Sequence, residues 1–306
     1  MAKGFIKSLY NSSRWCKLVL LLTVIIIYIW GYDRASNAVE GFIQRNKFVM
    51  KEGPAIYDSF YANIYDDLIM DKVKDEYEVG AIINTTRPTR ESLILDIGSG
   101  TGEHVAAFES KGIKAVGLDE SPAMVTLAKK KYPDLEFSVG NALDVMIYPA
   151  HTFTHITCLY FTLYYIKKKY LFFRNCYEWL KPGGYLIIHL VNRDLFDPIL
   201  NVADPLSMIS AQKYAKSRLT TSLVKFNNFQ YKGQFILDKP NDLAAFEETF
   251  ADNNNKVRKH VHRLYMPTSK KILNLAKEAG FVVEGKIDLA AVQYQYQNLY
   301  ILYKPD

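Results

Sequence analysis

The sequence predicts an α/β fold, a doubly wound parallel sheet with helices on both faces, and three observations support this. Apolar strand-like runs alternate with helical stretches between residues 92 and 191, and a glycine-rich turn follows the first run. After residue 191 the alternation stops, so we expect residues 192–268 to form a separate cap. The composition of 49% hydrophobic, 14% aromatic and 23% charged residues excludes disorder, collagen and a multi-span membrane protein.

Each element is predicted from its own local pattern. Apolar residues at helical spacing predict an amphipathic helix over residues 55–73, before the sheet begins. The predicted strands are residues 92–97, 114–119, 135–139, 154–160, 185–191, 281–287 and 299–303. The predicted helices that follow are residues 104–112, 123–131, 168–180 and 269–279. A Lys-Pro-Gly-Gly stop at residues 181–184 separates a helix from the most apolar strand.

The amino-terminal region has a different organisation. A basic tail (residues 1–17) precedes an uncharged apolar run (residues 18–32), and a polar linker (residues 33–54) leads to the globular domain at residues 55–306. The run is long enough to span a bilayer if the end of the tail is added, so we expect a single-pass membrane anchor. A cleaved signal peptide and a buried core helix remain alternatives. The flanking basic residues favour a cytoplasmic amino terminus, and the side of the domain is left open.

The charge pattern argues against a nucleic-acid partner. Lys and Arg total 38 against 32 for Asp and Glu, and the excess is spread along the chain. Two short basic runs, residues 129–131 and 167–169, are expected to be solvated at helix ends. Three scattered cysteines are too few for a disulfide framework or a zinc site with CxxC spacing.

Residues 94–104, with the sequence ILDIGSGTGEH, are the most informative part of the chain. The glycines let the backbone approach a ligand closely, and the free amides of the next helix suit an electronegative group. A dinucleotide is disfavoured, because Glu103 would face its pyrophosphate. Asp96 could instead reach an ammonium group, directly or through water, and Asp119 could accept two ribose hydroxyls. S-Adenosylmethionine has both groups.

Several motifs resemble those of class I S-adenosylmethionine-dependent methyltransferases of the small-molecule type, over about residues 55–306. LDIGSGTG resembles the family's first motif, GLDES at residues 117–121 the ribose-binding strand, and VGNALD at residues 139–144 the adenine-contacting one. LKPGGYLII is similar to the run before the fifth strand. The resemblance implies a Rossmann-like seven-stranded sheet with an antiparallel last strand. The cap insertion, residues 192–268, would then lie between the fifth strand and the last helix.

The resemblance also implies which residues contact S-adenosylmethionine. They are Tyr57, Tyr65, Asp96, Gly98, Ser99, Gly100, Thr101, Gly102, Asp119, Glu120, Met124, Asn141, Ala142 and Leu159. Two positions depart from the family pattern: Asn141 stands where Asp is usual, and His155 where an acid is common. The sequence after the fourth strand differs from the Asp-Pro-Pro-Tyr type, which counts against adenine-amine methyltransferases.

Methyl transfer to a hydroxyl or ammonium requires a group that takes the acceptor's proton. Candidates are expected where the strand ends meet the cap: His189, Tyr160 and Tyr164, followed by Tyr165 and Asp194. His189 lies inside an apolar strand, where a core histidine is the more ordinary interpretation.

A metal is not expected. His260 and His262 alternate along a strand-like run and could bind one, but solvated strand residues are the favoured interpretation.

The cap and the tyrosine-rich helix before the sheet are expected to hold a small or lipid-like acceptor, and the protein is expected to be a monomer. Membrane attachment would concentrate an acceptor dissolved in the bilayer. A protein methyltransferase and a non-catalytic, membrane-tethered domain that binds S-adenosylmethionine remain alternatives.

Overall fold

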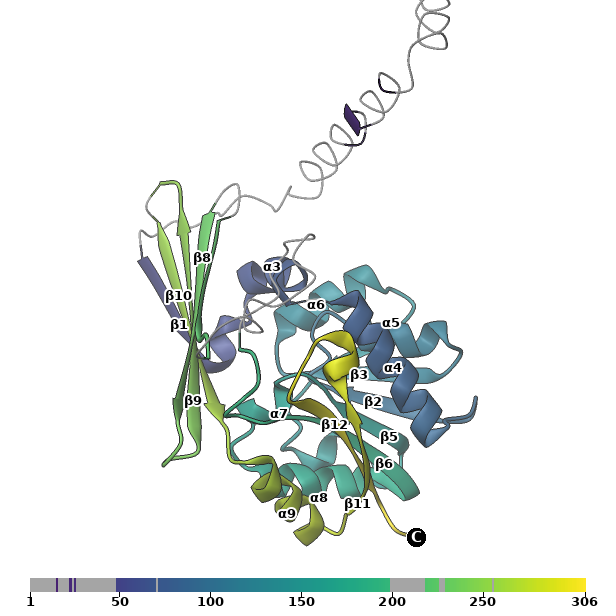
Figure 1. Cartoon of the computed structure of the whole chain (residues 1–306). Helices are drawn as coiled ribbons and strands as arrows, with labels where there is room; N and C mark the ends of the chain where they lie inside the picture. Colours follow the sequence, from purple (N-terminus) through teal and green to yellow (C-terminus); the bar gives the residue numbers. More distant parts are fainter. Residues whose placement is uncertain are drawn as a thin grey trace, which may run out of the picture.

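The computed structural model describes residues 48–69, 71–198, 218–225, 229–254 and 256–306, together with residues 15, 22, 23 and 25. Apart from those four residues, the predicted basic tail and membrane anchor lie outside the described residues, as does most of the linker. No helix in the described part of the chain is long and apolar enough to cross a membrane. The described residues form two sheets with helices packed around the larger one (Figure 1).

The main sheet has seven strands in the order β11-β12-β6-β5-β2-β3-β4. The strands are β2 (Leu93–Ile97), β3 (Lys114–Asp119), β4 (Glu136–Val139), β5 (Phe153–Cys158), β6 (Leu180–Val191), β11 (Val282–Asp288) and β12 (Gln297–Tyr303). Strands β2 to β6 pair in parallel, whereas β12 is antiparallel to both of its neighbours. The predicted doubly wound, Rossmann-like sheet with an antiparallel last strand is confirmed.

Helices cover both faces of this sheet (Figure 1). On one face α4 (Lys72–Thr86), α5 (Glu103–Ser110) and α6 (Pro122–Lys131) pack against the strands through residues such as Ile82 and Phe108. On the other face α8 (Lys169–Trp179) and α9 (Ser269–Glu278) bury Phe172, Trp179 and Ile272. Burial on both faces explains why the central strands read as continuous apolar runs.

The single helix predicted over residues 55–73 is replaced by three shorter helical elements, the last of which extends beyond it. A 3-10 turn, η1 (Gly53–Ile56), is followed by α3 (Ser59–Ile69) and then by α4, which was not predicted. The Asp71 carboxylate accepts hydrogen bonds from the amides of Val73 and Lys74, both at 3.1 Å, and so starts a new helix.

Strand β6 begins at Leu180, before the predicted residue 185. The predicted stop at residues 181–184 is part of the strand, because the Gly183 amide donates to the Lys304 carbonyl and the Lys304 amide donates to that of Gly184. Pairing with the carboxyl terminus therefore holds this segment in the sheet, although Gly183 has a φ of +74° and the pairing with β5 shifts register beside it.

The insertion at residues 192–268 forms a second sheet, here called the cap sheet, which confirms the predicted separate layer. Its strands are β1 (Phe48–Glu52), β7 (Thr221–Lys225), β8 (Phe229–Asp238), β9 (Leu243–Asp252) and β10 (Val257–Tyr265), in the order β1-β10-β9-β8-β7. Strand β1 corrects the predicted linker, which ran to residue 54. As a short edge strand with Phe48 and Met50 exposed, it is held by parallel pairing with β10 and carries little apolar pattern.

A third hydrophobic core joins the cap sheet to the rest of the molecule. Tyr61 and Ile64 of α3 pack with Met124 of α6 and with Tyr231 and Phe250 of the cap sheet. Helix α3 thus lies between the two sheets and fixes their separation (Figure 1).

A buried ion cluster ties α4 to α5. The carboxylate of Glu78, which has no exposed surface, lies 2.8 Å from the Lys74 ammonium and 3.1 Å from His104 Nε2. Burial alone would raise the pKa of Glu78, but Lys74 and His104 outweigh it and lower the pKa from 4.5 to about 2.

We predict that Glu78→Gln lowers the free energy of unfolding by about 3 kcal/mol at pH 7, because it leaves a buried ammonium without its partner. The folded-state pKa is depressed, so this stabilisation is complete above pH 4.5 and lost as the pH falls towards 2. Urea unfolding at several pH values measures it. Glu76→Gln, on the exposed side of the same helix, is the control, and equal stability of the two variants at pH 7 would refute the prediction.

Candidate functional site

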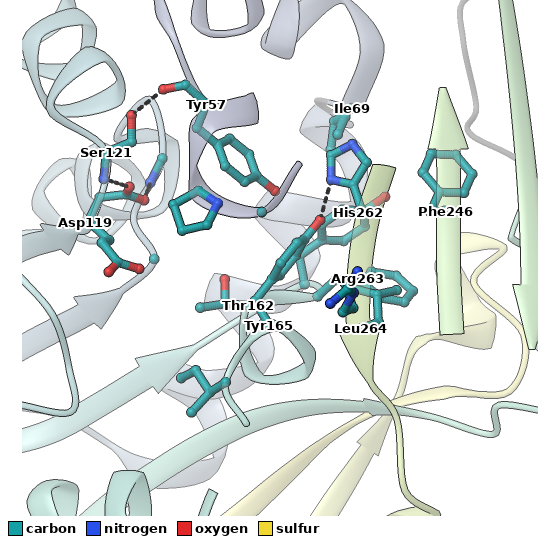
Figure 2. A pocket seen from close by; sticks show the side chains of 18 of the residues that line it. Tyr57, Ile69, Asp119, Ser121, Thr162, Tyr165, Phe246, His262, Arg263 and Leu264 are labelled. Carbon is teal, nitrogen blue, oxygen red and sulfur yellow. Dashed lines mark hydrogen bonds between the residues drawn. The ribbon is translucent and has the colours of Figure 1, made fainter. Parts of the chain in front are cut away.

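A cavity of about 630 Å³ opens at the carboxyl ends of β2, β3 and β5, where the main sheet faces the cap sheet (Figure 2). This volume is typical of small-molecule sites, and the end of a doubly wound sheet is their usual position. Glycines and polar groups line the side nearer the main sheet, and aromatic rings line the side nearer α3 and the cap sheet.

The glycine-rich turn after β2 forms the floor of the cavity. Gly98 and Ser99 both donate their amides to the Leu118 carbonyl, at 2.7 and 3.2 Å, which holds the turn against the end of β3. Gly98 has a φ of +73°, and a Cβ there would lie 2.4 Å from Thr162 Cγ2. Gly100, with a φ of +55°, has space beside it, since the nearest atom to a Cβ would be Tyr65 Cε1 at 3.8 Å. The turn is therefore a cradle that requires glycine and leaves room for a ligand.

Asp119, at the end of β3, fixes this cradle. Its Oδ2 accepts a hydrogen bond from the Gly100 amide at 2.9 Å, and its Oδ1 accepts one from the Ser121 amide at 2.8 Å. Burial raises the pKa of the carboxyl group, although these two amides act against it. Each oxygen keeps a further lone pair, so the carboxylate can also accept the two ribose hydroxyls expected from the sequence.

Asp96 lies behind the cavity lining. It is 2% exposed, and its Oδ1 accepts a hydrogen bond from Thr157 Oγ1 at 2.7 Å, which joins β2 to β5. Burial raises its pKa to about 6. That Asp96 reaches a ligand's ammonium, directly or through water, stays a prediction.

The predicted cofactor residues divide into two groups, according to whether they line the cavity. Those that line the cavity are Tyr57, Tyr65, Gly98, Gly100, Asp119, Glu120, Met124, Asn141 and Ala142. Those that lie behind the lining are Asp96, Ser99, Thr101, Gly102 and Leu159. Thr101 donates its hydroxyl to Asp66, which ties the turn to α3.

Of the five predicted proton acceptors, two line the cavity and three do not. His189 is fully buried outside the lining, and burial lowers its pKa to about 4, which fits the core interpretation. The Tyr164 hydroxyl accepts the Val191 amide at 2.9 Å and is also buried. Asp194 pairs with Lys239 at 2.6 Å, away from the cavity. Tyr160 and Tyr165 do line the cavity, and Tyr160 has a strained φ of +50°.

The interpretation of His260 and His262 as solvated residues was wrong. Both are buried, with 0% and 2% exposure, and face Glu248 of β9 across the strand pairing. His262 also lines the cavity, together with Phe246 and Leu264 (Figure 2). The histidine alternation in the sequence was the available signal, but the buried carboxylate opposite it depends on how β9 pairs with β10.

The comparisons with known proteins agree with this geometry. Residues 95–188 match the methyltransferase domain family. The S-adenosylmethionine-dependent methyltransferase from Clostridium acetobutylicum superposes with a TM-score of 0.61 at 16% identity, over 80% of this chain and 98% of that one. Residues 95–188 are thus similar in sequence to the methyltransferase domain family, and the chain shares the fold of the Clostridium acetobutylicum protein.

Two curated relatives are similar in sequence to part of this chain. One is the dTDP-4-amino-2,3,4,6-tetradeoxy-D-glucose N,N-dimethyltransferase of Saccharopolyspora spinosa, 31% identical over 45% of this chain and 57% of that protein. The other is the demethylmenaquinone methyltransferase of Chlorobaculum parvum, 34% identical over 34% of this chain and 44% of that protein. The chain thus spans about half the length of these relatives.

We predict that Asp119→Asn weakens binding of S-adenosylhomocysteine about 5- to 150-fold. The asparagine side chain has one acceptor oxygen, whereas the carboxylate has two. Either the Gly100 or the Ser121 backbone amide therefore loses its hydrogen-bond acceptor, which costs about 1–3 kcal/mol. Isothermal titration of the full chain measures the affinity. Asp134→Asn, in an exposed turn, is the control, and an affinity for Asp119→Asn within twofold of wild type would contradict the prediction.

Proposed function

We propose that the protein transfers a methyl group from S-adenosylmethionine to a small-molecule acceptor held between the main sheet and the cap sheet. One observation carries this: the glycine cradle with Asp119 and an aromatic wall from α3 and the cap sheet share one cavity. The room beside Gly100 and the free lone pairs of Asp119 fit the cofactor's ribose and its neighbouring atoms.

Bound S-adenosylmethionine supplies a methyl group activated by a sulfonium. The residues of this chain then have to align the acceptor and exclude water. Tyr57, Tyr61 and Tyr65 line one wall, with ring centroids 5.4 to 6.5 Å apart, and cover the space above the glycine turn. Such a packed aromatic wall suits both tasks.

The acceptor side of the cavity is largely apolar. Phe161, Phe196, Phe235 and Phe246 line it, and exposed Lys167 and Arg263 add positive charge. An acceptor with a flat or apolar body and an anionic or polar end fits this wall. The two curated relatives are named for an amino-sugar nucleotide and a quinone, and both chemistries have this character.

We also propose that the apolar run at residues 18–32 anchors the protein in a membrane. The support is its length and lack of charge, with a basic tail before it. A tethered domain would meet a bilayer-dissolved acceptor at high local concentration, which favours a lipid-like or quinone-like substrate.

We expect the purified full-length chain to transfer labelled methyl from S-adenosylmethionine to a low-molecular-weight acceptor. A prenylated hydroquinone, an amino-sugar nucleotide and a total membrane lipid extract are the substrates to test. Thin-layer chromatography detects the product, and Asp119→Asn serves as the impaired variant. Label found in polypeptides on a gel would point to a protein methyltransferase, and binding without turnover on any acceptor would refute the proposal.

The membrane proposal has its own measurement. After cell fractionation, we expect the full chain to remain in the membrane pellet through alkaline carbonate washing, because an inserted helix resists it. A variant with Val24→Arg and Ile26→Arg, which places two charges in the run, should move to the supernatant. Release of the unaltered chain by carbonate would contradict anchoring.

A further inference from the structure

A buried polar cluster lies where the cap sheet meets the cavity. Glu248 and His260 have no exposed surface, and His262 is 2% exposed. Glu248 Oε2 lies 2.7 Å from His262 Nε2 and 3.4 Å from His260 Nδ1, and its Oε1 accepts the Tyr231 hydroxyl at 3.0 Å. A buried carboxylate held by three donors is fixed in position.

The hydrogen bonds define the proton positions on His262. A carboxylate only accepts, so Nε2 of His262 carries a proton and donates it to Glu248. In the neutral imidazole Nδ1 then carries a lone pair, and it lies 2.7 Å from the Tyr165 hydroxyl, which can donate a hydrogen bond to it. Burial raises the pKa of Tyr165, which keeps that hydroxyl protonated at neutral pH.

His262 and Tyr165 reach the same cavity as the cofactor cradle. Both line it together with Gly100 and Asp119, and Figure 2 shows Tyr165 and His262 meeting beside the Tyr57 ring. The Tyr57 carbonyl accepts the Ser121 hydroxyl at 2.6 Å, and its ring centroid lies 5.9 Å from that of Tyr165. The cluster therefore faces the space in which an acceptor would meet the methyl donor.

We propose that Tyr165, His262 and Glu248 form a relay that takes a proton from the methyl acceptor, and that the acceptor atom is therefore one that loses a proton on methylation: a hydroxyl oxygen, an amine nitrogen or an activated ring carbon. This inference rests on the proposed function and adds the class of acceptor to it. An acceptor that loses no proton, such as a thioether, would leave this buried relay without a role.

The step balances for a hydroxyl acceptor. Its oxygen forms a bond to the methyl carbon while the carbon–sulfur bond breaks and leaves its electron pair on sulfur. The hydroxyl proton passes to the Tyr165 oxygen as the Tyr165 proton passes to His262 Nδ1. Tyr165 ends neutral, and His262 ends as an imidazolium beside the Glu248 carboxylate, which stabilises it. The extra proton leaves to solvent after product release, and an amine acceptor follows the same path.

The surroundings favour a relay over a metal site. Arg258 Nε donates to His260 Nε2 at 2.7 Å, and the Arg258 guanidinium also contacts Asp58. A fixed positive charge thus sits beside one of the two imidazoles and repels a cation. Burial of Glu248 would raise its pKa, but the two imidazoles outweigh it and lower the pKa to about 2, so the group is an ionised acceptor.

The first test needs no acceptor substrate. Histidine-selective ¹⁵N NMR of the full chain, assigned through the signal lost in His262→Gln, reports which nitrogen carries the proton. We expect the Nε2–H tautomer at pH 8. The Nδ1–H tautomer would overturn the relay, and so would tight Zn²⁺ binding that is lost in His260→Ala, because the cluster would then be a metal site.

The second test compares turnover on the prenylated hydroquinone and the amino-sugar nucleotide. We expect His262→Gln to lower kcat about 100-fold or more, Tyr165→Phe to lower it less, and added imidazole to restore part of the His262→Gln activity. Affinity for S-adenosylhomocysteine should stay within threefold of wild type in both variants, which separates the relay from the fold and the cofactor site. His151→Gln, an exposed histidine, is the matched control.

The pH profile gives a further readout. The groups that face His262 are Glu248, His260, Tyr57, Tyr61 and Tyr165. The pH dependence of kcat should differ between wild type and His262→Gln, because the variant lacks the group that receives the acceptor's proton. Equal kcat and equal profiles in wild type and His262→Gln would overturn the relay. A wild-type chain that methylates neither probe counts against the proposed function, and the NMR result still decides the relay.

Discussion

The hydrogen bonds accepted by Asp119 are the interactions on which the rest of the site depends. One carboxylate holds the Gly100 amide in the turn after β2 and the Ser121 amide at the start of α6. It thereby joins the turn after β2 to the start of the helix that follows β3, while the Gly98 and Ser99 amides hold the same turn to the Leu118 carbonyl.

The same contact connects the two sheets. Ser121, placed by Asp119, donates its hydroxyl to the Tyr57 carbonyl, and the Tyr57 ring packs edge-on against those of Tyr165 and His262. His262 in turn bonds Glu248 of the cap sheet. A line of direct contacts therefore runs from the cofactor half to the acceptor half of the cavity.

The main sheet could be predicted because its signals are local. The strand over residues 114–119 is observed with those bounds, and the glycine turn needs only its own sequence to define its shape. The local pattern is therefore enough to predict that Gly98, Gly100 and Asp119 lie together, and all three line the cavity.

The cap could be predicted only as a separate layer. Which residues its strands bury depends on how strands from distant parts of the chain pair, and the local pattern does not show this. Strand β10 buries Arg258, His260, His262 and Leu264 on one side, and a polar face of this kind gives no apolar alternation. Lys169, in a basic run expected to be solvated, is buried for a similar reason. Its ammonium donates to the Ile166 and Tyr265 carbonyls, both at 2.7 Å, and the latter belongs to β10.

The two ends of the insertion lie together at its base. Ser269 Oγ donates to the Val191 carbonyl at 3.0 Å, and Arg193 Nη1 donates to the Met266 carbonyl at 2.6 Å. The main sheet could therefore be closed across this junction by a short linker, or receive a different insertion there. Replacing the insertion would also affect β1. This strand lies before the main sheet in the sequence, but it forms the edge of the cap sheet and pairs with β10. In modular terms, the cap sheet is encoded in two separate stretches of the chain.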